Sequence, residues 1–272
     1  MKLLRKVLLL VLFVLTSICI SSCKAKTSIE DKTFIEGDFE FALLRDKDEL
    51  TIVGLSDDGK DKETLVLPTI VDGKKVTTLG YEYYNPLYPT RELRIDFSGA
   101  SFKNFYVHSL IEKCESKVGN EITCKVYKAN FYYPNFLKRL ARGILCDELD
   151  QGYITEKAKK EAFEEDPNDF LSRIYKSANV IYYMNDDTDE VFFVDDCDGT
   201  KVNVIPPNPY RDGYEFKGWY KEKECINLFD FENELIPEKE YDEKGNYILK
   251  ETNIYAKWEV LKWELLRSYF IL

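Results

Sequence analysis

The 272-residue sequence has little histidine, methionine or tryptophan: one, two and three residues, respectively. A single histidine, His108, leaves few options for imidazole-based catalysis or metal binding. The motifs GxxxxGK[ST], GxGxxG, HExxH and GxSxG do not occur, so the best-known phosphate, dinucleotide, zinc-protease and serine-hydrolase sites are not expected. There is no CxxC pair to suggest a zinc site. These absences predict a protein that is not an enzyme and has no cofactor or metal.

Positive charge is also scarce, with 38 Lys and Arg against 49 Asp and Glu and a net charge of −11. Nucleic acid is therefore not an expected partner, because phosphate binding needs a basic surface. Aromatic residues are plentiful, and tyrosine (19) exceeds phenylalanine (17), which suits half-exposed sheet faces better than a dry core. The apolar fraction of 44% is that of a globular chain, and the length suggests one or two domains.

The first residues have the pattern of an export signal. Lys2, Arg5 and Lys6 precede an apolar run, residues 7–20, broken only by Thr16 and Ser17. As a helix this run would span ~21 Å, which is short of the ~30 Å hydrocarbon core of a bilayer. A cleaved signal is therefore favoured over a permanent membrane span.

The run ends in Ile20, Ser21, Ser22 and Cys23, which resembles a bacterial lipobox. The resemblance implies removal of residues 1–22 and a diacylglyceryl group on Cys23, with residues 23–33 as a tether. Two acyl chains anchor a protein stably, so the expected location is the outward face of a bacterial cell membrane. Removal of three positive charges would leave the mature chain at −14. The alternative is an ordinary signal peptide cut near Ser22, with Cys23 incidental.

Five cysteines remain after the signal and the lipobox. Since five is odd, at least one is unpaired or intermolecular. A bridge between Cys114 and Cys124 across a hairpin and a set of mostly buried free thiols both stay open. The five are Cys114, Cys124, Cys146, Cys197 and Cys225.

Residues 34–133 read as a β-rich domain. Strands are expected at 39–44, 50–53, 65–68 and 76–80, with turns at 56–60 and 72–75. The segments 50–54, 65–68 and 71–80 resemble the opening of BspA-type leucine-rich-repeat surface proteins, which implies a hairpin followed by a solenoid. Further strand candidates at 93–97, 105–107 and 122–127 are irregularly spaced, so a small ordinary β domain is the alternative.

Residues 134–178 change to helical spacing and are predicted to form a helical spacer. Apolar residues recur from Phe136 to Leu149, and Thr155 is an expected N-cap for a charged helix over 156–165. A third short helix is expected around residues 170–175. These stripes indicate core contacts rather than a ligand site.

Residues 179–258 return to strand patterns, with strands expected at 180–184, 191–194, 202–205, 214–220 and 252–258. A Gly-Tyr-x-Phe-x-Gly-Trp-Tyr motif and a closing Ile-Tyr-Ala-Lys-Trp make this segment similar to the internalin-type B repeat. That resemblance implies a β-grasp-like module of bacterial surface proteins, with a protruding hairpin around residues 242–246. The motif residues, expected to be structural, are Gly213, Tyr214, Phe216, Gly218, Trp219, Tyr220, Tyr255, Ala256 and Trp258.

Two finer expectations concern this module. A period of two places Tyr214, Phe216 and Gly218 on one strand face and Trp219 on the other. The acidic run Asp195, Asp196 and Asp198 hints at a calcium loop, but the EF-hand register fails, and a turn between strands is favoured.

The sequence therefore predicts an α+β fold that is mostly β: a β-rich, degenerate leucine-rich-repeat-like domain, a short helical spacer and a β-grasp-like repeat module. The tail, residues 259–272, is expected to lie back on the body. The leading hypothesis is a non-catalytic, lipid-anchored binding or adhesion protein of the cell surface, whose partner is an extracellular protein or glycan. The alternatives are a passive envelope spacer and, less favoured, a solute-capture or hydrolytic lipoprotein.

Overall fold

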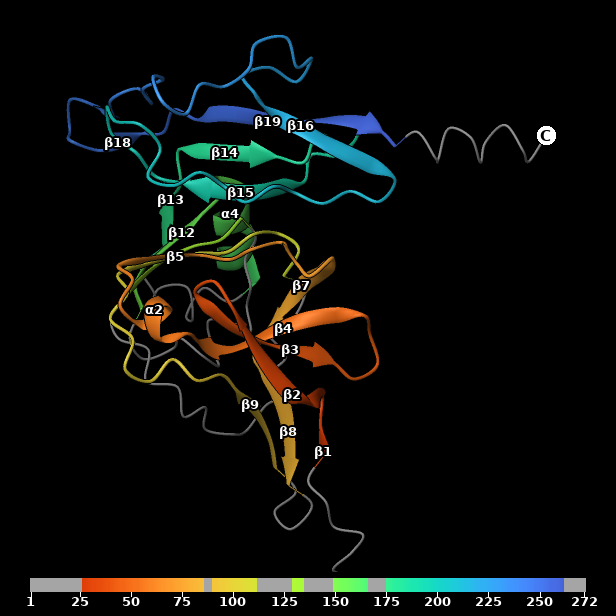
Figure 1. The fold of residues 1–272 in the computed structure, drawn as a ribbon. Helices are drawn as coiled ribbons and strands as arrows, with labels where there is room; N and C mark the ends of the chain where they lie inside the picture. Colours follow the sequence, from red (N-terminus) through yellow and green to blue (C-terminus); the bar gives the residue numbers. More distant parts are fainter. Residues whose placement is uncertain (1–25, 86–89, 112–128, 135–148, 166–174, 262–272) are drawn as a thin grey trace, which may run out of the picture.

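The computed structural model describes residues 26–85, 90–111, 129–134, 149–165 and 175–261 (Figure 1). Several sequence expectations lie outside these residues: the signal peptide, the lipobox and Cys23, the strand at 122–127, and most of the first and third helices and of the tail. Cys114, Cys124 and Cys146 also lie outside them. Strands far outnumber helices among the described elements, which confirms the coarse fold class, mostly β. No helix in these ranges has the length and apolar character needed to cross a membrane.

An N-terminal sheet has the strand order β2-β3-β4-β7-β6. Strands β2, β3 and β4 form an antiparallel meander, β7 adds parallel to β4, and β6 pairs with β7 through a tight hairpin. Asp72 and Gly73 both have positive φ in this hairpin, as a primed turn requires. The strands are β2 (Ile29–Glu36), β3 (Phe39–Leu44), β4 (Glu49–Leu55), β6 (Ile70–Val71) and β7 (Lys74–Leu79).

The predicted turn at 56–60 is instead a short helix, α2 (Asp57–Lys60). Ser56 caps it, accepting a hydrogen bond from the Gly59 amide at 3.0 Å. A small antiparallel sheet, of order β1-β8-β9, extends downward from the N-terminal sheet in Figure 1. Its strands are β1 (Lys26–Thr27), β8 (Tyr81–Asn85) and β9 (Thr90–Arg94). The interpretation of residues 23–33 as a tether is wrong for its described part, because β1 and the start of β2 pair with other strands there.

A third sheet has five parallel strands; its first strand comes from the segment between β4 and β6, and the other four follow β9 in the chain. Within this sheet the strands lie side by side in their order along the chain. Three successive pairings recur at similar intervals, Phe105 with Phe131, Phe131 with Gly152, and Gly152 with Tyr175, but the interval from Leu65 to its partner Phe105 is longer. The Asn130 side chain donates to that of Asn104 at 3.1 Å, linking neighbouring strands. The strands are β5 (Thr64–Val66), β10 (Asn104–Tyr106), β11 (Ala129–Tyr132), β12 (Leu149–Ile154) and β13 (Tyr175–Ser177).

This sheet corrects the interpretation of residues 134–178 as a helical spacer. Two of its strands, β12 and β13, lie within that range; they pair with each other, and β12 also pairs with β11. The helix α4 (Glu156–Glu165) forms as predicted, and Thr155 caps it by accepting a hydrogen bond from the Ala158 amide at 3.1 Å. The segment therefore continues the parallel sheet, because its short apolar runs can pair with strands that are distant in sequence.

The C-terminal module forms a four-stranded sheet of order β15-β14-β19-β16. Strands β14 and β19 are parallel, and the two outer strands pair antiparallel to them. The predicted hairpin around residues 242–246 is present, closed by β17 (Glu240–Tyr241) and β18 (Tyr247–Ile248). The sheet consists of β14 (Val180–Tyr183), β15 (Val191–Asp195), β16 (Tyr214–Tyr220) and β19 (Thr252–Val260).

Two expectations for this module are wrong. Residues 202–205 do not form a strand; the Asn203 amide instead donates to the Asp195 carboxylate at 2.7 Å. Trp219 does not point away from Phe216, because a β-bulge lies between them: Phe216 pairs with Trp258, whereas Trp219 pairs with Ala256. Gly218 adopts φ +121 in this bulge, and the extra residue returns Trp219 to the side of Phe216, with ring centroids 5.2 Å apart.

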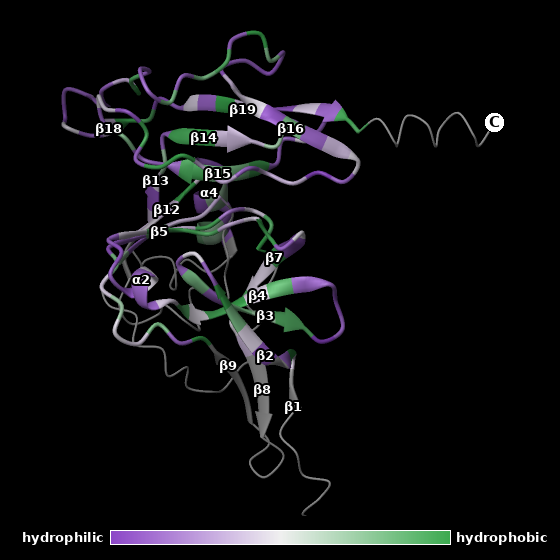
Figure 2. Ribbon diagram, viewed as in Figure 1, coloured by the Kyte–Doolittle hydropathy of each residue, from purple (hydrophilic) through white to green (hydrophobic). Residues whose placement is uncertain are grey.

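The parallel sheet forms a wall shared by two cores. Phe105 and Phe131 belong to the core beneath the N-terminal sheet, whereas Tyr106 and Tyr132, next to them in sequence, belong to the core of the C-terminal module. Strand β15 contacts β11 and β12. Apolar residues lie along strands in both parts of the molecule (Figure 2). The C-terminal module is therefore seated directly on the parallel sheet.

Candidate functional site

The junction between the parallel sheet and the C-terminal module contains a tyrosine stack, formed by Tyr106, Tyr132 and Tyr153 on three successive strands. The ring centroids of Tyr106 and Tyr132 are 4.1 Å apart, and those of Tyr132 and Tyr153 are 4.4 Å apart. Phe193 of β15 continues the stack, 5.5 Å from Tyr106. Parallel strands in register bring equivalent side chains above one another, so this stack is a direct product of the repeated pattern.

Asp195 joins the tyrosine stack to the module through a fully buried carboxylate. It accepts hydrogen bonds from the Tyr106 hydroxyl (3.0 Å), the Asp196 amide (2.8 Å) and both the amide and the side chain of Asn203 (2.7 and 2.8 Å). Burial and the Asp195 charge hold the pKa of Tyr106 far above its ordinary value, so this hydroxyl stays a donor. The network is a structural connection, because the Asp195 carboxylate and the Tyr106 hydroxyl are both buried and hydrogen-bonded to each other.

The acidic run after β15 is likewise tied into the structure. Lys239 forms an ion pair with Asp196 at 2.7 Å, and the Asp198 carboxylate accepts from the Lys239 amide. Burial raises the pKa of Asp196. Within the described ranges no cluster of three or more His, Cys, Asp or Glu side chains could hold a metal ion.

His108 and the two described cysteines also occupy structural positions. His108 is buried, lies 3.0 Å from the Pro68 carbonyl through Nε2 and stacks on Phe192 with centroids 5.9 Å apart. Burial lowers its pKa to about 4. Cys197 and Cys225 are free thiols, and burial raises the pKa of both. His108 and Cys197 are therefore enclosed by the fold, whereas Cys225 is partly exposed.

The predicted motif residues divide between the two faces of the repeat sheet. Phe216, Trp219, Ala256 and Trp258 belong to the module core, and the Trp258 indole donates to the Met184 carbonyl at 2.5 Å. Gly213, in the turn before β16, has a positive φ, and Arg211 lies 3.8 Å above the ring of Tyr214. These residues lie in the core, in the turn before β16 and at the start of that strand.

Tyr220 and Tyr255 differ from them, because they lie on the outer face of the sheet. With Tyr183 they form a tyrosine row across β14, β19 and β16: Tyr183 pairs with Tyr255, and Tyr255 with Tyr220. The rings of Tyr183 and Tyr255 stack with centroids 5.3 Å apart, and all three side chains are partly exposed. Lys257 covers Tyr220 at 4.9 Å. The sequence pattern indicated neither Tyr183 nor the row, since the row joins strands that lie far from one another along the chain.

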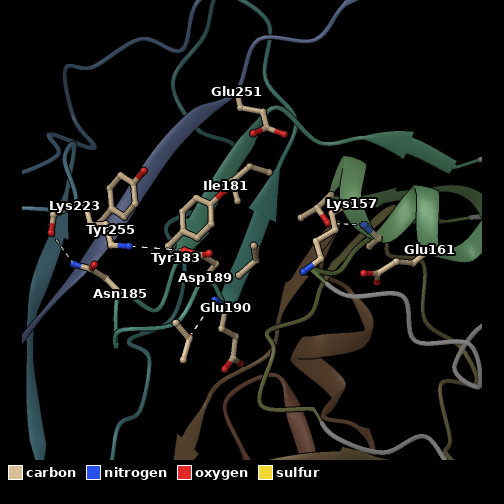
Figure 3. A pocket seen from close by; sticks show the side chains of 14 residues that line it. Lys157, Glu161, Ile181, Tyr183, Asn185, Asp189, Glu190, Lys223, Glu251 and Tyr255 are labelled. Carbon is tan, nitrogen blue, oxygen red and sulfur yellow. Dashed lines mark hydrogen bonds and ion pairs between the residues drawn. The ribbon is translucent and has the colours of Figure 1, made fainter.

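A cleft of about 690 Å³ lies beside the tyrosine row, between the outer face of the sheet and helix α4. Lys157 and Glu161 line it from α4, Tyr183 and Tyr255 from the sheet, and Asp189 from the turn between β14 and β15 (Figure 3). Its volume is within the range of small-molecule and cofactor sites, and its walls come from two separate parts of the chain.

One end of the cleft is fixed by Asn185, which has a positive φ of 51. Its side-chain amide donates to the carbonyls of Lys223 and Ala256, both at 3.0 Å, and thereby ties the β14–β15 turn to β19 and to the loop after β16. A residue with this backbone conformation and two such bonds holds the turn in a defined position.

Acidic groups outnumber basic groups around the cleft. Glu161, Asp189, Glu190 and Glu251 face Lys157 and Lys223, and the Lys223 ammonium is 3.8 Å from the Asp189 carboxylate. Burial raises the pKa of Glu251, and burial followed by the Glu251 charge raises the pKa of Tyr183. The cleft therefore offers aromatic surface, hydrogen-bond acceptors and donors, and a negative potential.

A comparison with known protein families gives a match, which lies in the C-terminal module. Residues 179–242 match the Listeria-Bacteroides repeat domain family. This confirms the B-repeat part of the sequence interpretation, and the family is a repeat type of surface proteins, in agreement with an envelope protein. Neither the curated proteins nor the solved structures contain a match to the chain. Strand β19, which carries Tyr255, follows the matched segment.

Proposed function

We propose that this chain is a non-catalytic binding or adhesion protein, held by lipid on the outward face of a bacterial cell membrane. The observation that carries the proposal is the partly exposed tyrosine row beside a polar cleft, on a module of a surface-protein repeat type. Aromatic side chains supply contact area at low cost in side-chain entropy, which suits a binding surface. The partner class is an extracellular protein or a glycan.

The anchor part of the proposal is supported by the sequence before residue 24. A basic start, an apolar run and a lipobox-like end in Cys23 occur in the order that lipid modification requires. The excess of acidic residues in the remaining chain gives no attraction to anionic headgroups, so attachment would depend on the acyl chains.

We also propose finer fold assignments for the two parts of the chain. The parallel sheet is a short, degenerate leucine-rich-repeat-like solenoid, because the paired positions from β10 to β13 recur at the period of such repeats, which is about 20–29 residues. The pairing of β5 with β10 spans a longer interval and departs from that period. The module sheet, with parallel central strands flanked by antiparallel ones, supports a β-grasp-like description.

A rigid envelope spacer is a second candidate, and the junction is the observation that favours it. The buried carboxylate of Asp195 and the tyrosine stack fix the module on the parallel sheet, which would suit a spacer that must not bend. A spacer needs no exposed aromatic row, so the two candidates differ in whether the tyrosine row contributes to any binding.

The anchor is tested by membrane fractionation of cells that express Cys23→Ala. We expect the variant to leave the membrane fraction and to lose incorporation of an alkyne-labelled fatty acid. Cys19→Ala, which changes a cysteine within the signal itself, is the matched control and should behave like the unmodified chain. Equal labelling of the Cys23→Ala chain would contradict lipid attachment at this residue.

Binding is tested with beads that carry the chain from residue 24 onward, which keeps every described residue. The beads are incubated with matrix proteins, mucin and cell-wall glycan. We expect capture of at least one of these, and loss of that capture in the Tyr183→Ala, Tyr255→Ala double variant. Tyr241→Ala removes a tyrosine that is 58% exposed in the β17–β18 hairpin and should leave capture unchanged. Capture of none of them would favour the spacer.

A further inference from the structure

We infer that the tyrosine row and the cleft beside α4 together form a binding site for an oligosaccharide that is not polyanionic. The inference rests on the proposed binding function and adds to it the chemical class of the ligand and the residues that contact it. Tyr183 and Tyr255 would stack on sugar rings, and charged side chains from α4 and the β14–β15 turn would bond to hydroxyl groups.

The aromatic part of the site matches the apolar faces of sugar rings. Tyr183, Tyr255 and Tyr220 occupy paired positions on three neighbouring strands. Neighbouring strands lie ~4.8 Å apart, so the row extends over roughly 10 Å. Lys257 lies over the ring of Tyr220, so the open aromatic surface beside the cleft comes from the stacked rings of Tyr183 and Tyr255. A chain of linked sugar rings can contact this surface and still reach the polar groups of the cleft, which suits it better than a single small molecule.

The polar part of the site matches hydroxyl groups. Glu161 and Asp189 offer carboxylate acceptors on opposite sides of the cleft, and Lys157 offers an ammonium donor (Figure 3). Hydrogen bonds to ionised groups are shorter and stronger than neutral ones, and a sugar hydroxyl can both donate and accept. A ligand rich in hydroxyl groups can therefore satisfy both kinds of partner in one cleft.

The charged side chains that line the cleft indicate which saccharides can bind there. Four carboxylates and two ammonium groups line the cleft, and one ammonium, that of Lys223, is near the Asp189 carboxylate. Like charges brought together at a binding surface are unfavourable, so uronic-acid, sulfated and phosphorylated chains are disfavoured. Neutral or amino-bearing saccharides meet no such repulsion.

The position of the tyrosine row favours a saccharide over an extended peptide. Peptides commonly bind sheets by adding a strand to a free edge, where unpaired backbone groups are available. Tyr183 and Tyr255 lie on β14 and β19, the two central strands, whose backbones are already paired on both sides. A ligand at this position therefore contacts side chains on the face of the sheet and not unpaired backbone groups at an edge.

The inference is tested by isothermal titration calorimetry on the chain from residue 24 onward. The probes are three hexasaccharides: the neutral hexamer of N-acetylglucosamine, the neutral β-linked hexamer of glucose, and a hexasaccharide of hyaluronan, which carries carboxylates. We expect at least one neutral hexamer to bind and the hyaluronan probe to bind at least tenfold more weakly or not at all.

Variants then assign the contact to the row and the cleft. We expect Tyr183→Ala and Tyr255→Ala each to weaken binding at least tenfold, and Tyr183→Phe to retain most of it. Tyr241→Ala is the matched control and should bind like the unmodified chain. Glu161→Gln, on α4, should weaken binding severalfold without altering the sheet. If an alanine variant fails to fold, the tyrosine ultraviolet difference spectrum on adding the hexamer, compared between the unmodified chain and Tyr183→Phe, assigns the contact to Tyr183.

The outcomes separate this inference from the proposed function. Binding of neutral hexamers that the tyrosine variants leave unchanged would overturn the site. Preference for the hyaluronan probe would overturn the charge argument. If no hexamer binds and the ultraviolet spectrum stays unchanged, while the beads capture a matrix protein through the tyrosine row, then the saccharide inference is wrong and the binding function stands.

Discussion

The bond between the Tyr106 hydroxyl and the Asp195 carboxylate is the most direct test of how the two parts of the chain are joined. Tyr106 lies on β10 of the parallel sheet and Asp195 on β15 of the C-terminal module, and their oxygens are 3.0 Å apart in a buried environment. The substitution Tyr106→Phe removes this hydroxyl and keeps the ring that stacks on Tyr132 and Phe193.

The expected loss in the free energy of unfolding follows from the hydrogen bonds that the substitution removes and those that remain. In this variant the Asp195 carboxylate still accepts hydrogen bonds from the Asp196 amide and from the amide and side chain of Asn203. The loss is then that of one hydrogen bond to a charged acceptor, about 1.5–3 kcal/mol of the free energy of unfolding. Asp195→Ala removes the acceptor from several buried donors at once, and we expect a larger loss, about 3–5 kcal/mol.

Urea denaturation followed by tryptophan fluorescence measures this loss, because Trp219 and Trp258 lie in the module core. Tyr241→Phe, in the exposed hairpin, is the control and should change the free energy of unfolding by no more than about 0.5 kcal/mol. A double-mutant cycle of Tyr106→Phe with Asp195→Ala isolates the pair. If Tyr106→Phe is as stable as the unmodified chain, the hydroxyl does not hold the module on the parallel sheet.

Three further predictions concern stability. Trp219→Ala, at a side chain only 3% exposed, should lower the free energy of unfolding by about 3–5 kcal/mol; an unaltered melting curve would contradict its place in the core. Gly218→Ala should lower the free energy of unfolding by about 1–3 kcal/mol, because a residue with a side chain is strained at φ +121 and its Cβ would lie 3.1 Å from the Leu228 side chain. Lys217→Ala, at the neighbouring position, is the control in the same thermal melt. In the folded chain His108 stays neutral until the pH falls to about 4, whereas in the unfolded chain it protonates below about 6.5. The free energy of unfolding should therefore fall by about 3 kcal/mol as the pH falls through this window. Denaturation at pH 7 and pH 4.5 should therefore show a smaller acid destabilisation in His108→Phe than in the unmodified chain, and equal pH dependence would be inconsistent with a buried neutral imidazole.

Local patterns in the sequence predicted much of the local structure. Strands at 39–44, 180–184 and 214–220 follow from short β-branched and aromatic runs between turn residues, and Thr155 marks the start of α4 because its hydroxyl can cap a helix. Residues 202–205 have the same composition as a strand, yet Asp195 supplies the acceptor for the Asn203 amide. The alternation of apolar and polar residues within 202–205 does not indicate that a buried acceptor elsewhere in the chain competes for this amide.

Pairing between distant segments could not be predicted in the same way. Strands β10 to β13 are short, and long stretches of dissimilar sequence separate each from its parallel partner, so the sheet is visible only when the strands are assembled. For the same reason the sequence indicated Tyr220 and Tyr255 as motif residues but could not show that they share a face with Tyr183. The cleft depends in addition on where α4 lies, which no pattern near the repeat module encodes.

The single inserted residue at Gly218 reverses the sides that simple alternation would give to Trp219 and Tyr220, sending the indole inward and the phenol toward solvent. Anyone transplanting this strand into another scaffold must carry the glycine with it, since an ordinary flat strand of equal length would expose the indole and bury the phenol. One permissive backbone position thus decides which ring stabilises the module and which remains available for contact.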